Sequence, residues 1–329
     1  MNKKKILTFI LLINNFNLCV YGDTKGIDIL NDLISTNNSK NEFVPTTKIN
    51  GSLFFTFGAL DSPSSREYFD FTYENKIKIN TSFTGSDKLL TIIESGNAME
   101  SPLNIDLQSK KGDKLKISTL LYQFQIGNGF EAIIGPKMFG YNGLSGKSTA
   151  YNERIAILDG SNYTTSSGIG PGVGISKRNK NGFNVSLKLA SNDNQIKDET
   201  THFISQIGFT KKNFGGTITS NLNNEFNAFG IAAFYKYKKF PSISASIEQK
   251  EGDSIKTTNN WIIGLQKNLE NKKYGLAVGT YNSEENICYE AWSEVDITDK
   301  SKVIPVFFIR EKNNINDEFG FAINYKFNY

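Results

Sequence analysis

Few residues in this sequence could act as a nucleophile, a general base or a metal ligand. The 329 residues include one histidine, His202, and two cysteines, Cys19 and Cys288. Nucleophilic catalysis commonly relies on a histidine base, and zinc sites use several cysteines or histidines. His202 is therefore the one candidate base, and the sequence predicts no metal site and no cofactor. The chemistry that remains is electrostatic, because the chain has 37 Lys+Arg and 33 Asp+Glu.

The first 22 residues have the pattern of a secretion signal. Three lysines at positions 3–5 precede a short apolar run over 6–13, and the small residue Gly22 ends the stretch. A run this short does not span a bilayer and is typical of a cleaved signal peptide, so we predict that residues 1–22 are removed. A lipoprotein signal that uses Cys19 is the alternative, but the residues before Cys19 are not small.

Removal of the signal changes the charge of the chain. It takes away three lysines and no acid, so the net charge falls from +4 to +1 (4 − 3 = 1). Nucleic-acid binding needs a concentrated basic face, and a nearly neutral chain does not predict it. Residues 23–44 then form a short N-terminal extension that is too small to fold alone, and residues 45–329 remain for one main domain.

Apolar and polar side chains alternate with a period of two along the main domain. At the C-terminus, apolar residues occupy every second position from Phe319 to Tyr329, with small or polar residues between them. Successive side chains on a strand point to opposite faces, so this pattern predicts strands with one apolar and one polar face. The same alternation occurs over 69–79, 115–121, 183–189, 229–237 and 243–247.

Two architectures use strands of this kind. A soluble sandwich turns the apolar face inward, whereas a membrane barrel turns it outward toward lipid. Segments near ten residues long, Phe and Tyr near the strand ends, and charged side chains on the polar face favour the membrane barrel. We therefore predict an all-β transmembrane antiparallel barrel, with a secreted β-sandwich adhesin as the alternative.

The segments number about sixteen, an even number as in bacterial single-chain barrels. Connections after even strands are short, and several after odd strands are longer and more polar, including 97–113, 140–166, 191–200 and 250–260. Membrane barrels have short periplasmic turns and longer external loops, so this alternation predicts the orientation of the barrel. The predicted strands are 50–59, 69–82, 88–97, 114–124, 129–139, 167–177, 182–191, 201–211, 214–221, 226–238, 241–250, 259–268, 273–282, 287–297, 302–311 and 317–329.

The longest connection, 140–166, follows the fifth predicted strand. A structureless loop of this length is uncommon and usually functional. We expect it to fold into the barrel as a constriction loop, because its apolar stretch 155–158 would have nothing to pack against on an exposed tip. The alternatives are an exposed loop and an additional hairpin within the same residues. The charged residues assigned to the constriction loop are Lys147, Glu153, Arg154 and Asp159.

Several short motifs carry a resemblance to a known family. They are the segments 45–51 (PTTKING), 80–87 (NTSFTGSD) and 297–300 (ITDK), and the end Phe327-Asn328-Tyr329. The chain as a whole resembles the general bacterial porins, and more narrowly it is similar to the cyanobacterial outer-membrane porins, which are grouped near the carbohydrate-selective porins. Members of that family commonly carry a surface-layer-homology domain before the barrel, and residues 23–44 are too few to form one.

The resemblance implies a sixteen-stranded barrel in the bacterial outer membrane, with a constricting loop after the fifth strand. It also implies contact with outer-membrane lipid, assembly as a homotrimer, and insertion by the barrel-assembly machinery, which would read Phe327 and Tyr329 as its signal. The expected activity is transmembrane transport rather than catalysis. Such a pore would pass small hydrophilic solutes by passive diffusion, with ion transport and carbohydrate transport as the two expected uses.

The charged residues out of phase with the apolar face are expected to line the pore. Lysine and arginine in a pore favour anions, and the modest excess of lysine predicts a weak anion preference. Two alternatives stay open: these charges could pair with one another in a wide channel, and the barrel could be an outer-membrane lipase or protease with His202 as its base. The predicted lining residues are Lys76, Lys78, Lys114, Lys116, Lys188, Lys236 and Lys326 with Glu94, Glu131, Glu248, Glu290 and Glu294.

Overall fold

A computed structural model of the chain describes most of residues 44–329. The described ranges are 44–62, 65–103, 105, 112–146, 148–151, 158, 164–165, 168–192, 201–252, 255–281, 283–312 and 315–329. The predicted signal peptide, 1–22, and nearly all of the predicted extension, 23–44, lie outside these ranges, as do all four charged residues assigned to the constriction loop.

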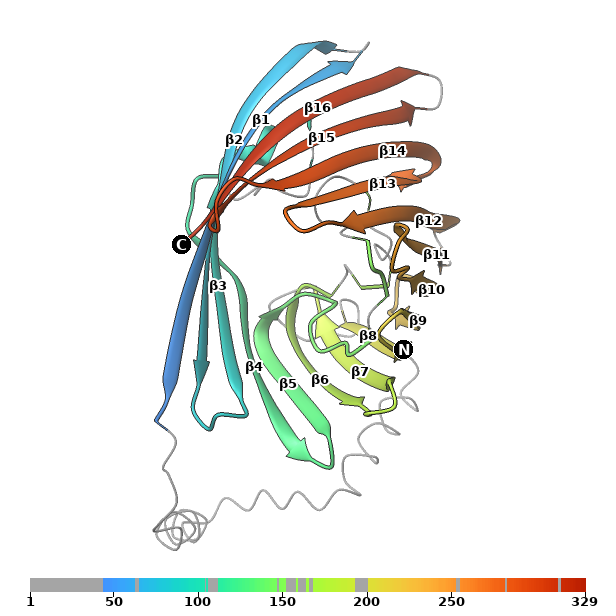
Figure 1. Cartoon of the computed structure of the whole chain (residues 1–329). Helices are drawn as coiled ribbons and strands as arrows, with labels where there is room; N and C mark the ends of the chain where they lie inside the picture. The colour runs from blue at the N-terminus through green and yellow to red at the C-terminus, as the bar shows by residue number, and fades with distance from the viewer. Residues whose placement is uncertain are drawn as a thin grey trace, which may run out of the picture.

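Sixteen antiparallel strands form one closed barrel (Figure 1). Each strand pairs with its neighbours in sequence, and β1 pairs with β16 over Ser52–Asp61 and Phe319–Asn328 to close the ring. The prediction of an all-β antiparallel barrel with sixteen strands is therefore confirmed. The strands are β1 Thr46–Ser62, β2 Ser65–Ser82, β3 Lys88–Gly96, β4 Lys116–Gly127, β5 Phe130–Met138, β6 Gly170–Arg178, β7 Phe183–Ser191, β8 Thr201–Thr210, β9 Phe214–Leu222, β10 Asn227–Tyr235, β11 Ser242–Gly252, β12 Ile255–Asn268, β13 Lys272–Tyr281, β14 Ser283–Asp296, β15 Ser301–Lys312 and β16 Ile315–Asn328.

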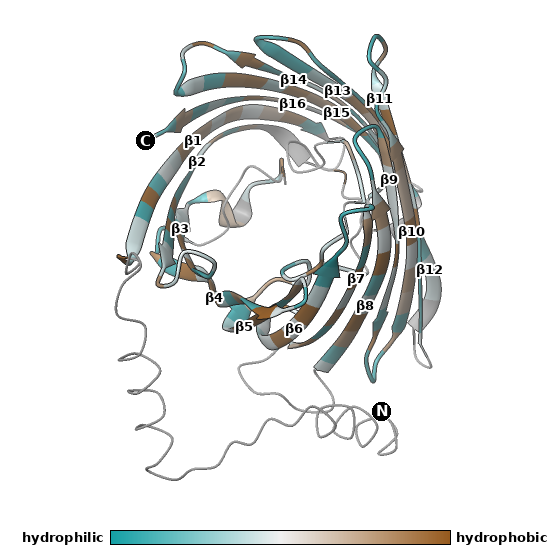
Figure 2. Cartoon of the chain, turned by 60° about the horizontal axis from the view of Figure 1, so that its bottom comes forward, coloured by the Kyte–Doolittle hydropathy of each residue, from teal (hydrophilic) through white to brown (hydrophobic). Residues whose placement is uncertain are grey.

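The alternation of side chains places the aromatic residues on the outside of the barrel. On β1, Phe55 and Phe57 are exposed on the outer face, whereas Phe54 and Thr56 between them are buried. Phe55 stacks on Phe71 of the neighbouring strand with ring centroids 6.2 Å apart. Figure 2 shows the same alternation of hydrophobic and hydrophilic residues along many strands. Among the described residues, no helix is long and apolar enough to cross a membrane.

The connections agree with the prediction at one end of the barrel and, with one exception among the four ranges named, at the other. All connections after even strands are short turns, as predicted. One predicted longer loop, 250–260, is wrong, because the hairpin ladder continues through it: β11 runs to Gly252, β12 starts at Ile255, and Lys250 pairs with Thr258. Polar residues sustain this pairing because backbone hydrogen bonds do not depend on an apolar face.

The inner wall of the barrel is partly apolar, which the sequence pattern did not predict. A cluster of buried residues lies inside the ring of strands and includes side chains from β1 and β12–β16 together with residues of two connections, β3–β4 and β5–β6. Figure 2 looks into the ring and shows the short 3-10 helix η1, Ala98–Glu100, inside it. The apolar members on the strands are Leu60, Ile262, Ala277, Cys288, Trp292, Ile304, Val306, Phe308 and Ala322.

The turn between β2 and β3 is held by one carboxylate. Asp87 Oδ1 accepts hydrogen bonds from Ser82 Oγ at 2.7 Å and from the backbone N–H groups of Phe83 and Thr84 at 2.9 Å each. Its other oxygen accepts from Tyr122 Oη of β4 at 2.6 Å. Burial opposes ionisation of this group, but the hydrogen bonds, first among them the one from Tyr122, outweigh burial and hold the pKa of Asp87 well below its usual range.

We predict that Asp87→Asn lowers the thermal midpoint of the barrel in detergent near pH 7. The native pKa lies below the unfolded value of about 4, so the carboxylate stabilises the fold above about pH 4, and this contribution is lost as the pH falls through the native pKa. The difference between wild type and variant should therefore shrink in acid. Asp299→Asn, at an exposed position in the turn after β14, is the control and should change little. A destabilisation by Asp87→Asn that persists unchanged in strong acid would contradict this account.

Candidate functional site

The connection between β5 and β6 lies against the inner wall of the barrel. Its first part is fixed by backbone groups that donate to wall side chains: the Ser145 N–H to Ser186 Oγ of β7 and the Gly146 N–H to Gln206 Oε1 of β8, both at 2.8 Å. Bonds of this kind satisfy loop amides that no strand partner could reach. The described part of the loop therefore lies inside the barrel, as predicted for the connection after the fifth strand.

The loop then passes along the inner face of β11 and β12. The N–H groups of Ala150 and Tyr151 both donate to Ser244 Oγ of β11, at 2.9 and 3.1 Å. The Tyr151 ring lies against Gly264 of β12, where a Cβ atom would come within 2.7 Å of the ring. A glycine at this position lets the aromatic ring lie directly on the wall.

The loop also binds Glu290 of β14, a carboxylate that is 4% exposed. One carboxylate oxygen of Glu290 accepts from Tyr151 Oη, and the other accepts from the Leu158 N–H at 2.9 Å. Trp292 Nε1 donates to the same Tyr151 oxygen at 2.8 Å. Buried charge-assisted hydrogen bonds are among the stronger polar contacts in proteins, so this group fixes the loop across the barrel from β7 to β14.

Three of the predicted lining charges lie beneath this loop. Lys188, Glu248 and Glu290 are on the inner face of their strands but are only 2%, 2% and 4% exposed. Lys188 Nζ donates to the backbone oxygens of Phe139 and Gly140, and Glu248 accepts from Thr164 Oγ1. These charged groups hold the loop in place and do not face open water.

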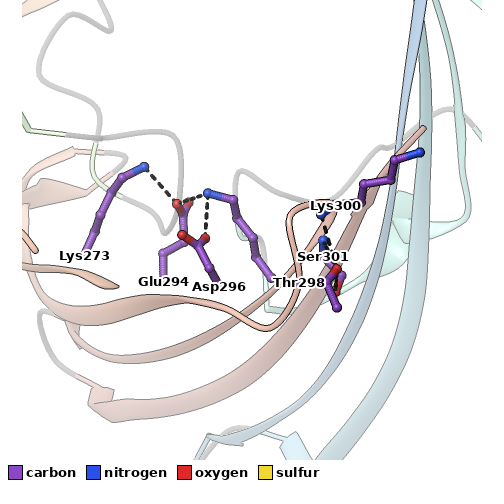
Figure 3. A network of polar contacts seen from close by, with 7 residues as sticks. Lys273, Glu294, Asp296, Thr298, Lys300 and Ser301 are labelled. Carbon is purple, nitrogen blue, oxygen red and sulfur yellow. Dashed lines mark hydrogen bonds and ion pairs between the residues drawn. The ribbon is translucent and has the colours of Figure 1, made fainter. Parts of the chain in front are cut away.

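A second group of charges lies at the end of the barrel that carries the short turns. Glu294 Oε1 accepts from Lys273 Nζ at 2.9 Å and from Lys302 Nζ at 2.7 Å, and Lys302 is 3.0 Å from Asp296 (Figure 3). The Glu294 side chain is 9% exposed, whereas the lysine side chains are 38% and 23% exposed. The lysines therefore extend over the Glu294 carboxylate toward the water of the lumen.

The same arrangement recurs on β2 and β3. Lys76 Nζ is 3.1 Å from Glu74 and 3.2 Å from Glu94. The Lys76 side chain is 37% exposed, while those of Glu74 and Glu94 are 8% and 12% exposed. The ammonium groups are thus more exposed than the carboxylates of Glu74, Glu94 and Glu294, whereas the Asp296 side chain is 41% exposed and as open to solvent as the lysines.

The other predicted lining residues are spread around the wall. Lys78 and Lys116 are exposed, and the register places Lys116 opposite Glu94. Glu131 accepts from Gln125 Nε2 at 3.2 Å.

Three more predicted lysines lie at the ends of strands or near them. Lys326 lies over the Phe54 ring at 5.0 Å. Lys114 precedes β4 and Lys236 follows β10, so both lie in connections instead of on strands, because β4 begins two residues later than predicted and β10 ends three residues earlier.

Several inner charges were missed by the sequence pattern. The two faces of β15 are both apolar over 303–309, so the phase that would have placed Lys302 and Arg310 inside could not be read from that strand. The neighbouring strands carry a signal for the inner face of β15, because Glu294 of β14 and Glu318 of β16 alternate with the outward-facing residues of their own strands. The missed residues include Glu74, Lys88, Arg178, Lys273, Asp296, Lys302, Arg310 and Glu318.

The C-terminal residues proposed as an assembly signal are joined to the start of β1. The Gly51 N–H donates to the Tyr329 backbone oxygen at 2.8 Å, and the Tyr329 N–H donates back at 3.0 Å. Tyr329 Oη donates to Asn75 Oδ1 at 2.9 Å, and the Phe327 and Tyr329 rings lie 6.4 Å apart on the outer side. The last residue thus belongs to the seam that closes the barrel.

The histidine and the described cysteine, which could serve other chemistry, are both buried among structural contacts. His202 is 1% exposed, and its ring nitrogens contact the side chains of Asn192 at 2.8 Å and Asn221 at 3.0 Å. Cys288 is buried in the apolar cluster. Within the described residues, no group of three or more His, Cys, Asp or Glu could hold a metal ion.

A closed sixteen-stranded barrel with a loop fixed inside it is the architecture of the bacterial porins, and solved porins match this chain in fold. A mutant of the Rhodopseudomonas blastica porin superposes with a TM-score of 0.63 at 9% identity, covering 86% of this chain and 100% of that one. The anion-selective porin from Comamonas acidovorans gives a TM-score of 0.60 at 10% identity, over 87% and 100%. No protein-family model and no curated protein matches the sequence.

We predict that Glu290→Ala releases the β5–β6 connection from the wall. The substitution leaves Tyr151 Oη and the Leu158 N–H without their acceptor, and each unpaired buried group costs about 1–3 kcal/mol. Limited trypsin digestion of the folded barrel should then give new cleavage within 139–169, with a lower thermal midpoint. Glu131→Ala removes a half-buried inner carboxylate away from Glu290 and is the matched control. Equal digestion of both variants would contradict the anchoring role of Glu290.

Proposed function

We propose that this protein is an outer-membrane porin, a water-filled channel for passive diffusion of small hydrophilic solutes. Three features support this function: the closed barrel, its exposed apolar outer face, and an inner wall with charged groups and a loop fixed inside. Inorganic ions are the first class of solute, and sugars are the second. The alternatives of a barrel hydrolase or a secreted adhesin have no observation in their favour, since the contacts described for His202 are with asparagine amides and the apolar faces point outward.

The preference we propose is for anions, and it is weak. The observation that carries it is the difference in exposure within the two ion-pair groups: Lys76, Lys273 and Lys302 reach into the lumen while Glu74 and Glu294 lie beneath them. A solute in the channel therefore meets these ammonium groups before Glu74 and Glu294, and cationic linings favour anions. The exposed carboxylate of Asp296 opposes this effect and keeps the preference weak. The Comamonas acidovorans protein of the same fold is itself anion-selective.

The proposed porin also has an expected maturation, assembly and location. We expect cleavage of residues 1–22, a homotrimer surrounded by outer-membrane lipid, and insertion by the barrel-assembly machinery through Phe327 and Tyr329. Kinship with the cyanobacterial porins remains part of this proposal and is supported by the short motifs at 45–51, 80–87 and 297–300.

We predict that purified protein in a planar bilayer under a KCl gradient gives a reversal potential with the sign of a weakly anion-selective channel. The double variant Lys273→Gln/Lys302→Gln should move this potential toward cation selectivity, because it removes the two ammonium groups that cover Glu294 and takes the Lys302 partner from the exposed Asp296. Lys211→Gln is the matched control, since Lys211 lies in the turn after β8 beside the outward-facing ring of Phe209. A clear cation preference of the wild type would refute the selectivity, and the absence of any conductance would refute the channel.

A further inference from the structure

Part of the connection between β3 and β4, within its described residues, also lies inside the barrel, although the sequence pattern assigned no role to it. Its described residues are 97–103, 105 and 112–115. Leu103 is 0% exposed and Ile105 is 2% exposed, and both belong to the apolar cluster inside the ring. The chain leaves β3 and reaches across the inner faces of β2, β1 and β16 as far as β15. This segment therefore lies at the end of the barrel opposite the short turns.

The wall beneath this segment is apolar and needs a cover. Val306 and Phe308 of β15, Leu60 of β1 and Ala322 of β16 point inward and are buried with it. Leu103 packs so closely on β1 that a Cβ atom at Gly58 would come within 2.6 Å of its Cδ1. Exposure of an apolar wall to a water-filled lumen is unfavourable in proportion to the area exposed, so burial favours the inward position of the segment.

One side chain of the wall holds the backbone of this segment. Arg310 of β15 is 3% exposed, and its guanidinium donates to the backbone oxygen of Pro102 at 3.2 Å and to that of Leu103. Arg310 Nη1 also lies 3.6 Å from Glu318 Oε2 of β16, a distance longer than a normal hydrogen bond. The guanidinium also lies 4.4 Å from the centroid of the Phe308 ring and 4.7 Å from that of Tyr281.

Arg310 is suited to this task for two physical reasons. Its planar group has five donors in a fixed geometry, so it can bind two adjacent carbonyl oxygens while its faces rest on aromatic rings. Its charge is also nearly removed from water, so the loop carbonyls supply hydrogen bonds that solvent no longer provides. If the segment left the wall, Arg310 would lose both carbonyl acceptors together.

We propose that Arg310 is a positioning residue that holds the β3–β4 connection inside the lumen as a second constriction, in addition to the β5–β6 connection. The inference rests on the proposed channel function and extends it. A segment that occupies part of the lumen reduces the cross-section open to ions, and pore diameter limits conductance and solute size. Release of the segment should therefore enlarge the channel while the barrel itself remains closed.

The test is single-channel conductance in a planar bilayer for variants at both sides of the contact. Arg310→Ala removes the donor on the wall, and Leu103→Ser weakens the apolar anchor on the segment without changing any strand. Each is expected to raise the conductance by about twofold. The double variant should conduct as either single variant does, because both act by freeing the same segment.

Glu318→Gln is the matched control, because it weakens the ion pair and leaves the bonds from Arg310 to the loop carbonyls in place. Its conductance should equal that of the wild type. Folding of every variant is checked by circular dichroism and by the shift in gel mobility on heating, and if Arg310→Ala does not fold, Leu103→Ser decides the question.

The outcomes separate the two proposals. A wild type that does not conduct would refute the channel function itself. A wild type that conducts, with folded Leu103→Ser and Arg310→Ala variants of unchanged conductance, would overturn the second constriction and leave the channel function standing. A rise caused equally by Glu318→Gln would assign the effect to the ion pair and would also overturn the role given to the loop contact.

Discussion

The pairing of β1 with β16 joins the two ends of the sheet, and the rest of the structure depends on that closure. Inside a bilayer there is no water to satisfy the N–H and C=O groups of a free strand edge, so a spanning sheet must close on itself. The seam extends to the last residue, where Tyr329 exchanges two backbone hydrogen bonds with Gly51. Closure also forces side chains to alternate between outside and inside, which is why one period-two pattern gives both the exposed apolar outer face and the inner wall of the barrel.

A ring of sixteen strands is too wide for the side chains of its own wall to fill, so water or other segments of the chain must occupy the interior. In this barrel two connections enter the lumen and share one apolar cluster with β1 and β12–β16. Buried charges such as Lys188 and Glu290 bind the entering backbone, while Lys78 and Lys116 remain exposed. One part of the inner wall is therefore buried beneath the connections that it binds, and the other part exposes charged side chains to the lumen.

The fold could be predicted from the sequence because apolar and polar side chains alternate along nearly every strand, so each strand is an independent sign of the same architecture. The prediction of sixteen strands was confirmed. The interior was harder to predict, since a charge that anchors a loop looks the same in sequence as one that faces water. Lys188 and Lys78 have similar neighbours along their strands, and only the loop that covers Lys188 distinguishes them. One signal was present: β15 is apolar on both faces over 303–309, as strands buried on both sides are, and this indicates an internal cover.

The placement of lysines above carboxylates also explains why the expected selectivity is weak. The group of Lys273, Lys302, Glu294 and Asp296 is neutral as a whole, and Lys76 with Glu74 and Glu94 carries one net negative charge, so from a distance neither group acts as a free positive charge. A dipole field falls off faster than that of a free charge, and at 0.1 M salt interactions between exposed charges are largely screened beyond about 10 Å. An ion therefore senses the ammonium groups only when it passes near them. In the proposed channel the two inner connections would narrow the lumen and bring passing ions closer to the wall, so the constriction and the exposed lysines would act together on the same ions.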